Sequence, residues 1–129
     1  MEVRKISKAV ISALTYIEDS IEVHGRSDEN KVIQQTWHAA SDLEYALFLF
    51  SLINPEETLS SSWKLPHIKQ PEIESLLVSS QNLLKEAAER LESEDLKEAH
   101  KKTWMARGQL LRIHDLFWKK QRKAQKFSR

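Results

Sequence analysis

The chain has 129 residues, with 20 Lys and Arg against 19 Asp and Glu, no Cys, two Gly and three Pro. A hydrophobic share of 40% and a charged share of 30% are typical of a soluble, helix-rich domain, and the high charge is also common in thermophilic proteins. The missing Cys excludes disulfide frameworks, thiolate metal sites and Cys nucleophiles. No apolar run reaches the roughly 18 residues that cross a bilayer. We therefore expect one cytoplasmic domain over 1–129 that has no membrane partner.

Apolar residues recur at helical spacing in four stretches, which predict helices over 3–24, 28–53, 71–92 and 94–125. Gly25 is expected to close the first helix in the left-handed conformation, and Ser27 to cap the second. Pro71 is expected to begin the third helix, and Ser93 to repeat the cap of Ser27 before the fourth. No segment alternates with period two, so the predicted fold class is all-α.

The second half of the chain resembles the first when the sequence is shifted by 67 residues without a gap. Ten aligned positions are identical, and they include the pattern Thr-Trp-x-Ala-x-x-x-Leu-x-x-x-x-x-Leu-Phe, which begins at Thr36 and again at Thr103. We interpret this as an internal repeat over 1–53 and 68–120, although any two amphipathic helices share some matches. The prediction is a four-helix bundle built from two duplicated antiparallel hairpins. A linker over 54–70 joins them, with Trp63 and Leu65 packed against the bundle.

The repeat also predicts how certain side chains pack. Ser41 and Gly108 fall at equivalent positions inside helices, and a Gly there destabilises a helix by about 1 kcal/mol relative to Ala. We expect a close helix crossing at these small residues. Trp37 and Trp104 are expected to pack in or at the edge of the core, with a ligand-stacking role as the alternative.

Motifs for chemistry are few. None of the five His residues lies three positions after a Glu, so the Glu-x-x-His pattern of di-iron bundles is missing. His38 and Asp42 lie four apart, which favours a local hydrogen bond over half a metal site. The two Gly residues are too far apart for a phosphate-binding loop. We expect no metal, no cofactor and no enzymatic activity.

Residues 83–117 place a short acidic turn between a Leu- and Ala-rich helix and an Ala- and aromatic-rich helix. This pattern resembles the hairpins of HEPN domains, of tetratricopeptide-like proteins and of small archaeal helical proteins. Many HEPN proteins are ribonucleases that use an Arg and a His a few residues apart. The resemblance implies Arg107 and His114, with six residues between them, as catalytic candidates, although Gly108 stands where the family has a polar residue.

Charge is uneven along the chain. Residues 1–67 have a net charge of −4 and residues 68–129 a net charge of +5. The segment 119–129 has six basic residues and no acid, and it should project past the bundle as the end of the last helix. We call it the basic arm, and its candidate binding residues are Trp118, Lys119, Lys120, Arg122, Lys123 and Lys126.

Three interpretations of the basic arm stay open. Its cations suit the negative end of the helix dipole and increase solubility. They could also neutralise the phosphates of a nucleic acid while an aromatic residue stacks on a base. The third interpretation is docking onto an acidic protein surface, including the first half of a second copy. The function that the sequence favours is a non-enzymatic helical binding or scaffold protein with a protein partner or self-association. The alternatives are a nucleic-acid-associated protein and the HEPN-like ribonuclease.

Overall fold

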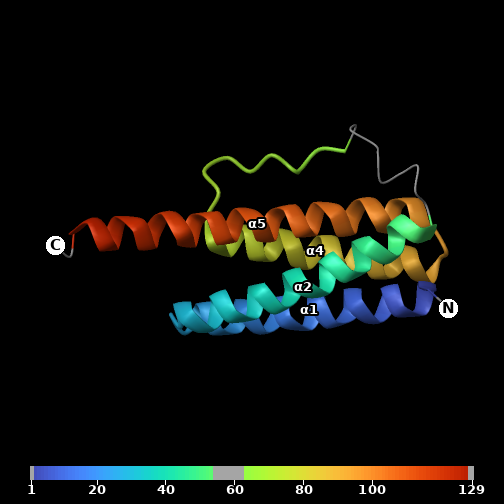
Figure 1. The fold of residues 1–129 in the computed structure, drawn as a ribbon, viewed down its shortest axis with the longest axis horizontal. Helices are drawn as coiled ribbons and strands as arrows, with labels where there is room; N and C mark the ends of the chain where they lie inside the picture. The colour runs from blue at the N-terminus through green and yellow to red at the C-terminus, as the bar shows by residue number, and fades with distance from the viewer. Residues whose placement is uncertain (1, 54–62, 128–129) are drawn as a thin grey trace.

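The computed structural model describes residues 2–53 and 63–127, and these ranges contain four α-helices and no strand. The helices are α1 (Glu2–Gly25), α2 (Glu29–Ile53), α4 (Ile73–Glu92) and α5 (Leu96–Phe127) (Figure 1). The all-α prediction is confirmed, and each predicted helix is present with ends that differ by at most two residues.

The turns within the two hairpins have the same geometry. The left-handed residue is Ser27 in the first turn, with φ of 60°, and Glu94 in the second, with φ of 62°. The prediction that Gly25 takes this conformation is wrong, because α1 continues through Gly25 and the chain reverses two residues later. Ser27 and Glu94 are 67 positions apart, so the offset of the sequence repeat also relates the two turns.

The helices that follow these turns are capped by aspartate rather than by the predicted serines. Asp28 Oδ1 accepts a hydrogen bond from the backbone N–H of Lys31 at 3.2 Å, and Asp95 Oδ1 accepts one from Glu98 at 3.3 Å. A short carboxylate at this position satisfies a free N–H group and also favours the positive end of the helix dipole. Ser27 lies outside the helix because its positive φ belongs to the turn.

The start of α4 also differs from the prediction. Glu72 is extended, with φ of −113° and ψ of 157°, and it is the N-cap; the helix begins at Ile73 rather than at Pro71. The Glu72 N–H donates to Ser75 Oγ at 3.1 Å, which gives a partner to a backbone group that the helix leaves free.

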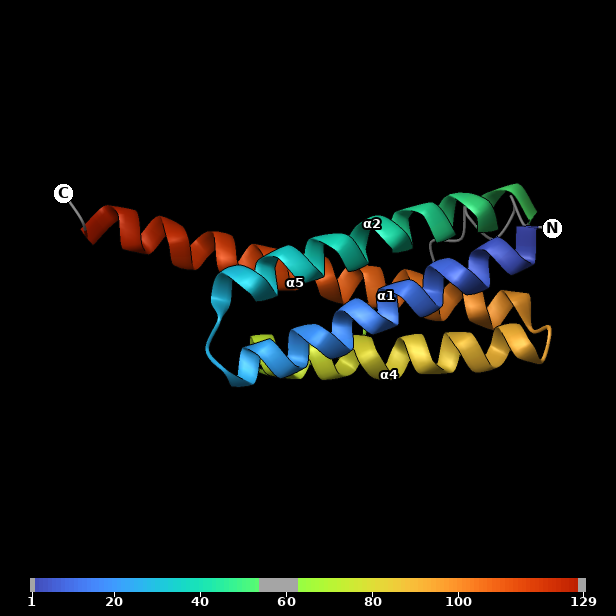
Figure 2. The same ribbon diagram turned by 90° about the horizontal axis from the view of Figure 1, so that it is seen from below.

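The two hairpins pack face to face. α1 is paired with α2 and α4 with α5, and the hairpins meet through contacts of α1 with α4 and of α2 with α5 (Figure 2). α2 and α4 run in the same direction, so the connection between them returns along the length of the bundle (Figure 1). This topology is a four-helix bundle with one long crossover.

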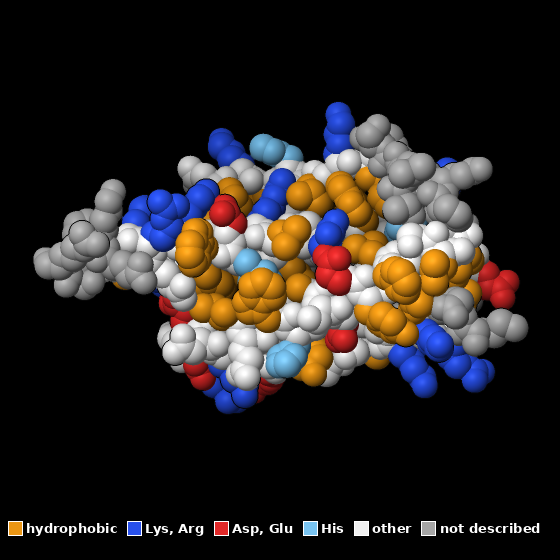
Figure 3. Space-filling view, viewed as in Figure 1, with side chains coloured by type: hydrophobic (Ala, Val, Ile, Leu, Met, Phe, Trp, Pro, Cys, Tyr) orange, Lys and Arg blue, Asp and Glu red, His pale blue; other side chains and the backbone are white. Residues whose placement is uncertain are grey.

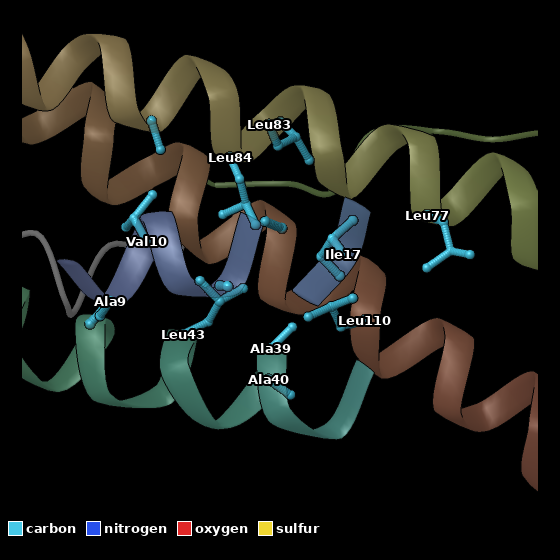
Figure 4. Close-up of a cluster of buried hydrophobic side chains, with 14 of the residues drawn as sticks. Ala9, Val10, Ile17, Ala39, Ala40, Leu43, Leu77, Leu83, Leu84 and Leu110 are labelled. Carbon is cyan, nitrogen blue, oxygen red and sulfur yellow. The ribbon is translucent and has the colours of Figure 1, made fainter. Parts of the chain in front are cut away.

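The core comes from equivalent positions of both hairpins. Leu43 of α2 and Leu110 of α5 are fully buried and point into the space between the helices (Figure 4). The pairs Val10 with Leu77 and Ile17 with Leu84 are also fully buried, and both pairs have the 67-residue offset. Each hairpin therefore contributes the same apolar stripe, and the stripes bury each other.

Polar contacts follow the same offset. Gln35 of α2 donates to Asp19 Oδ2 of α1 at 2.6 Å. The equivalent positions in the second hairpin form an ion pair, in which Lys102 Nζ lies 3.1 Å from Glu86 Oε2. The two hairpins therefore match in their turns, in their core positions and in a polar contact between their two helices.

The described part of the linker packs on α5, as predicted for Trp63 and Leu65. The Trp63 ring meets His100 edge to face at 4.8 Å and Trp104 at 5.9 Å between ring centroids. Leu65 lies over Gly108, where a methyl group would overlap Leu65 Cδ2. Gly108 therefore makes room for the linker. The expected close helix crossing is wrong, and the equivalent Ser41 is exposed on α2.

A buried polar chain holds the linker in place. Arg112 Nη1 donates to the carbonyl of Pro66 and to Gln109 Oε1, both at 3.1 Å. Gln109 is fully buried, and its Nε2 donates to Ser79 Oγ of α4 at 3.0 Å. The linker is thus connected to both helices of the second hairpin.

Replacing Gly108 with Leu should release the linker from α5, because the new side chain takes the space of Leu65. Overpacking of this kind destabilises a protein by about 1–3 kcal/mol, so local opening should rise by about fivefold to a hundredfold. Limited trypsin digestion after the exposed Lys64 measures this opening. The matched control is Ser41→Leu, which makes the same change at the equivalent exposed position. Equal cleavage rates in the two variants would contradict the role of Gly108.

Candidate functional site

Exposed aromatic and aliphatic side chains gather on the face formed by α2 and α5. Figure 3 shows this face, where hydrophobic side chains lie among charged ones over both helices. Its largest exposed members are Trp37, Tyr45, Phe48, Leu52, Leu111 and Trp118. We call this surface the α2·α5 face. A hydrophobic surface of this kind is a candidate binding site.

Two grooves lie on this face, at equivalent places in the two halves of the molecule. The first, which we call the Trp37 groove, has a volume of about 410 Å³ and is lined by Ile33 and Trp37 of α2 and by Leu111, His114, Asp115, Phe117, Trp118 and Gln121 of α5. The second, the Trp104 groove, has a volume of about 320 Å³ and is lined by Glu44, Leu47, Phe48 and Ser51 of α2, by His100, Trp104 and Arg107 of α5, and by Trp63 of the linker.

The repeat offset relates the two grooves. Trp37 corresponds to Trp104, and Ile33 corresponds to His100. Trp63 of the linker forms part of the Trp104 groove, whereas the described residues that line the Trp37 groove come from α2 and α5. The linker therefore forms one wall of one of the two equivalent grooves.

Trp37 is the clearest difference from the sequence prediction. It was expected to be in or at the edge of the core, but it is 58% exposed. One face of its ring stacks on His114, with centroids 4.3 Å apart and planes 14° apart. Trp104, at the equivalent position, is partly buried because Trp63 contacts it. The alternative expected for Trp37, a stacking surface, agrees with its exposure.

The hydrogen bonds around His114 favour one tautomer of its neutral ring. The Thr36 hydroxyl donates to the Val32 carbonyl at 2.9 Å, so its oxygen accepts from His114 Nε2–H at 3.0 Å. His114 Nδ1 is then an unprotonated nitrogen, and it is buried without a hydrogen-bond partner. A second proton would place a charge at this nitrogen. Burial accordingly lowers the pKa of His114 from its ordinary value of 6.5.

Arg107 and His114, the candidates for a ribonuclease pair, both have partners in the fold. Arg107 Nη1 forms an ion pair with Glu44 Oε1 of α2 at 2.8 Å, and its Nε is buried without a partner. The two residues lie on the side of α5 that faces α2, two helical turns apart, and each lines a different groove. The structure does not bring them together at one groove.

The basic arm projects past the bundle, as expected, because α5 continues to Phe127 beyond the start of α2 (Figure 1). Lys119 pairs with Asp115 at 3.1 Å, and Lys120 pairs with Glu29 of α2 at 2.7 Å. Arg122 and Lys123 are exposed, as is Trp118, which is 60% accessible and also lines the Trp37 groove. Lys126 lies in α5, and its side chain is outside the described part of the structure.

The described residues offer little that would form another kind of site. Among residues 2–53 and 63–127, no three His, Asp or Glu side chains converge in a metal-binding arrangement. His38 stacks on Tyr16 at 5.0 Å between centroids, so its partner is aromatic rather than the expected Asp42. Within the same ranges, none of the helices has the length and hydropathy of a membrane span.

Sequence reasoning found Trp118 and the arm but missed the grooves. A usable signal was present in the alignment of the repeats, where His114 stands opposite Leu47. A polar ring at a position that is aliphatic in the other half indicates a local difference in environment. The position of the linker, which distinguishes the two grooves, depends on contacts between residues far apart in sequence.

The lowered pKa of His114 predicts an acid-dependent loss of stability. Unfolded protein binds a proton at His114 near pH 6.5, whereas the folded protein does so only at lower pH. Titration of His114 therefore leaves the free energy of unfolding unchanged above pH 6.5. Below that pH it lowers the free energy of unfolding progressively, until the pH reaches the lower pKa of His114 in the folded protein. In His114→Leu, which copies the equivalent Leu47, this pH dependence should disappear. Urea unfolding of both proteins between pH 8 and pH 5 measures it, and parallel curves would show that His114 titrates normally.

Comparisons with known proteins find no relative of this chain. The chain matches no protein-family model, no curated protein and no solved structure.

Proposed function

We propose that this protein is a small, non-enzymatic binding module that holds a partner protein on its α2·α5 face, at the Trp37 groove. The observation that carries the proposal is the pair of equivalent grooves, of which only the Trp104 groove has a described linker residue, Trp63, packed into its lining. The Trp104 groove binds an aromatic side chain, Trp63, from another part of the chain. At the Trp37 groove, the equivalent positions of α2 and α5 are available to a side chain from another molecule.

The composition of the Trp37 groove supports a protein partner. Trp37, Leu111 and Trp118 are exposed together around it, at 58%, 49% and 60%. Tryptophan is among the residues that contribute most to protein–protein affinity, because its large ring excludes much water when it is covered. Its contact with His114 fixes the Trp37 ring before binding, so less side-chain entropy is lost on association.

An internal duplication explains why there are two grooves. We infer that the hairpins over 1–53 and 68–120 derive from one ancestral hairpin, and that the linker then covered the groove next to it. Equivalent turns, core positions and interhelical ties support this origin. The uncovered groove is the part of the repeat whose apolar surface still lacks a partner within the described chain.

The basic arm supports a second candidate, a nucleic-acid-associated protein. Arg122 and Lys123 are exposed beyond the end of the bundle, where they can approach a phosphate backbone. Trp118 lies next to them and could stack on an unpaired base. Lys119 and Lys120 contribute less to this alternative, because both already pair with acids of the bundle.

A photo-crosslinking amino acid at position 37 should capture a partner protein in cells, whereas the same amino acid at position 11 should not. Ile11 is 53% exposed, which matches Trp37 in accessibility, but it lies on α1. With the captured partner purified, Trp37→Ala should weaken its binding by about thirtyfold, the effect expected of a central tryptophan. Ile11→Ala should leave the affinity unchanged. Equal capture from both positions would contradict a specific site.

If the second candidate is correct, labelled single-stranded RNA or duplex DNA should bind the full chain with an affinity that decreases as salt increases. The double variant Arg122→Gln/Lys123→Gln should lower this affinity and reduce the slope of its salt dependence by about two. Fluorescence anisotropy at two salt concentrations measures both effects. The same reaction mixtures, run on a gel, report any cleavage of the RNA, and cleavage that His114→Ala removes would support the ribonuclease instead. Affinity that does not depend on the two cations would exclude Arg122 and Lys123 as the contact.

A further inference from the structure

We propose that the Trp37 groove binds an extended protein segment that lies along α2 as the linker lies along α5. In chain order, this segment has acidic residues, an aromatic residue, any one residue and a Leu. This inference rests on the proposed function and specifies the chemistry of the partner. It comes from the linker itself, which shows how a segment packs along the helix stripe beside the equivalent groove.

The linker follows one stripe of α5 whose residues are four positions apart. Trp63 contacts His100 and Trp104, and Leu65 covers Gly108. Arg112 then donates to the next carbonyl along the linker. Residues four apart lie on one side of a helix, about 6 Å from each other along its axis. The segment therefore runs parallel to α5, with its aromatic residue first and its Leu two residues later.

The same stripe exists on α2. The repeat offset places Ile33, Trp37, Ser41 and Tyr45 where α5 has His100, Trp104, Gly108 and Arg112. Trp37 is exposed, so its ring can contact an aromatic residue of the segment as Trp104 contacts Trp63.

The next two positions of the α2 stripe suit the rest of the segment. Ser41 is small and exposed, so a Leu can lie over it, although less deeply than over Gly108. Tyr45 is 48% exposed, and its hydroxyl can donate to a carbonyl as Arg112 does.

Charge distinguishes this groove from the covered one. The start of α2 lies beside the end of α5, as the ion pair between Glu29 and Lys120 shows. A segment parallel to α2 would bring the residues before its aromatic side chain to this end, near the exposed Arg122 and Lys123. Glu29 and Asp115, which face this end from α2 and α5, are paired with Lys120 and Lys119, and Asp28 at the same end caps α2. The remaining positive charge favours acidic residues at the start of the segment.

The test uses a fluorescein-labelled peptide, Asp-Asp-Ser-Trp-Lys-Leu-Pro-His, which joins two acids to the sequence of the linker. Anisotropy should show binding to the full chain. Trp37→Ala should weaken this binding by about tenfold or more, and Ile11→Ala should leave it unchanged. Replacing the peptide's Trp or Leu with Ser should have an effect similar to that of Trp37→Ala.

A second peptide, with Lys-Lys in place of Asp-Asp, tests the charge. It should bind more weakly than the acidic peptide, and the difference should disappear in Arg122→Gln/Lys123→Gln. Thermal unfolding of each variant checks that the fold is retained, which we expect because all the substituted side chains are exposed.

Three results would overturn the inference. In the first, the peptide binds equally well to Trp37→Ala but not to Trp104→Ala, so it displaces the linker instead. In the second, a scrambled peptide binds as well as the designed one. In the third, the chain dimerises in sedimentation at the assay concentration and Trp37→Ala makes it monomeric, so a second copy is the occupant. Capture of a partner by crosslinking at position 37 without peptide binding would refute the segment pattern and leave the proposed function standing.

Discussion

The structure depends on the contact between two hairpins that cannot bury their apolar stripes alone. Each hairpin presents a row of aliphatic side chains, such as Val10 and Leu43 in the first and Leu77 and Leu110 in the second. Because the rows are equivalent, the hairpins meet through like pairs, α1 with α4 and α2 with α5. Burial of this surface is the main stabilising contribution to the fold. It also fixes α2 and α5 side by side, which creates the face where both grooves lie.

The two halves differ mainly outside this contact. α5 is 32 residues long against 25 for α2, so only α5 extends beyond the bundle and carries charged side chains into solvent. The crossing linker covers α5 and leaves the stripe on α2 exposed. His114 replaces Leu47 at equivalent positions and gives the open groove a polar contact with Thr36. A symmetric core therefore supports two unequal surfaces, and the candidate functions all depend on these differences.

Much of the fold could be predicted from the sequence, because helical periodicity depends on local spacing and the identities at an offset of 67 residues mark equivalent helix positions in the two halves. Leu43, Thr36 and their partners in the second half follow that pattern and are buried. The helix caps were less predictable. Ser27 and Asp28 are both good capping residues, and only the φ of 60° at Ser27 assigns the cap to Asp28.

The candidate site was harder to predict, because it depends on where the linker lies. Trp37 and Trp104 have the same sequence context, so periodicity gives them the same environment. Trp63 covers one of them and not the other. Gly108 was recognisable as a residue that destabilises its helix, but Leu65, which packs over it, lies more than forty positions earlier in the chain. Sequence reasoning identified positions that needed an explanation, and only the tertiary contacts supplied it.

The linker also has a consequence for competition between the two grooves. Because it is part of the same chain, its effective concentration at the Trp104 groove is of the order of millimolar for a short flexible connection. A free segment with equal contacts would have to reach a similar concentration to replace it. At the Trp37 groove the same segment meets no tethered competitor from the described chain. The tether thus keeps the linker at the Trp104 groove unless a competitor reaches a similar concentration, whereas occupancy of the Trp37 groove would vary with the amount of partner in the cell.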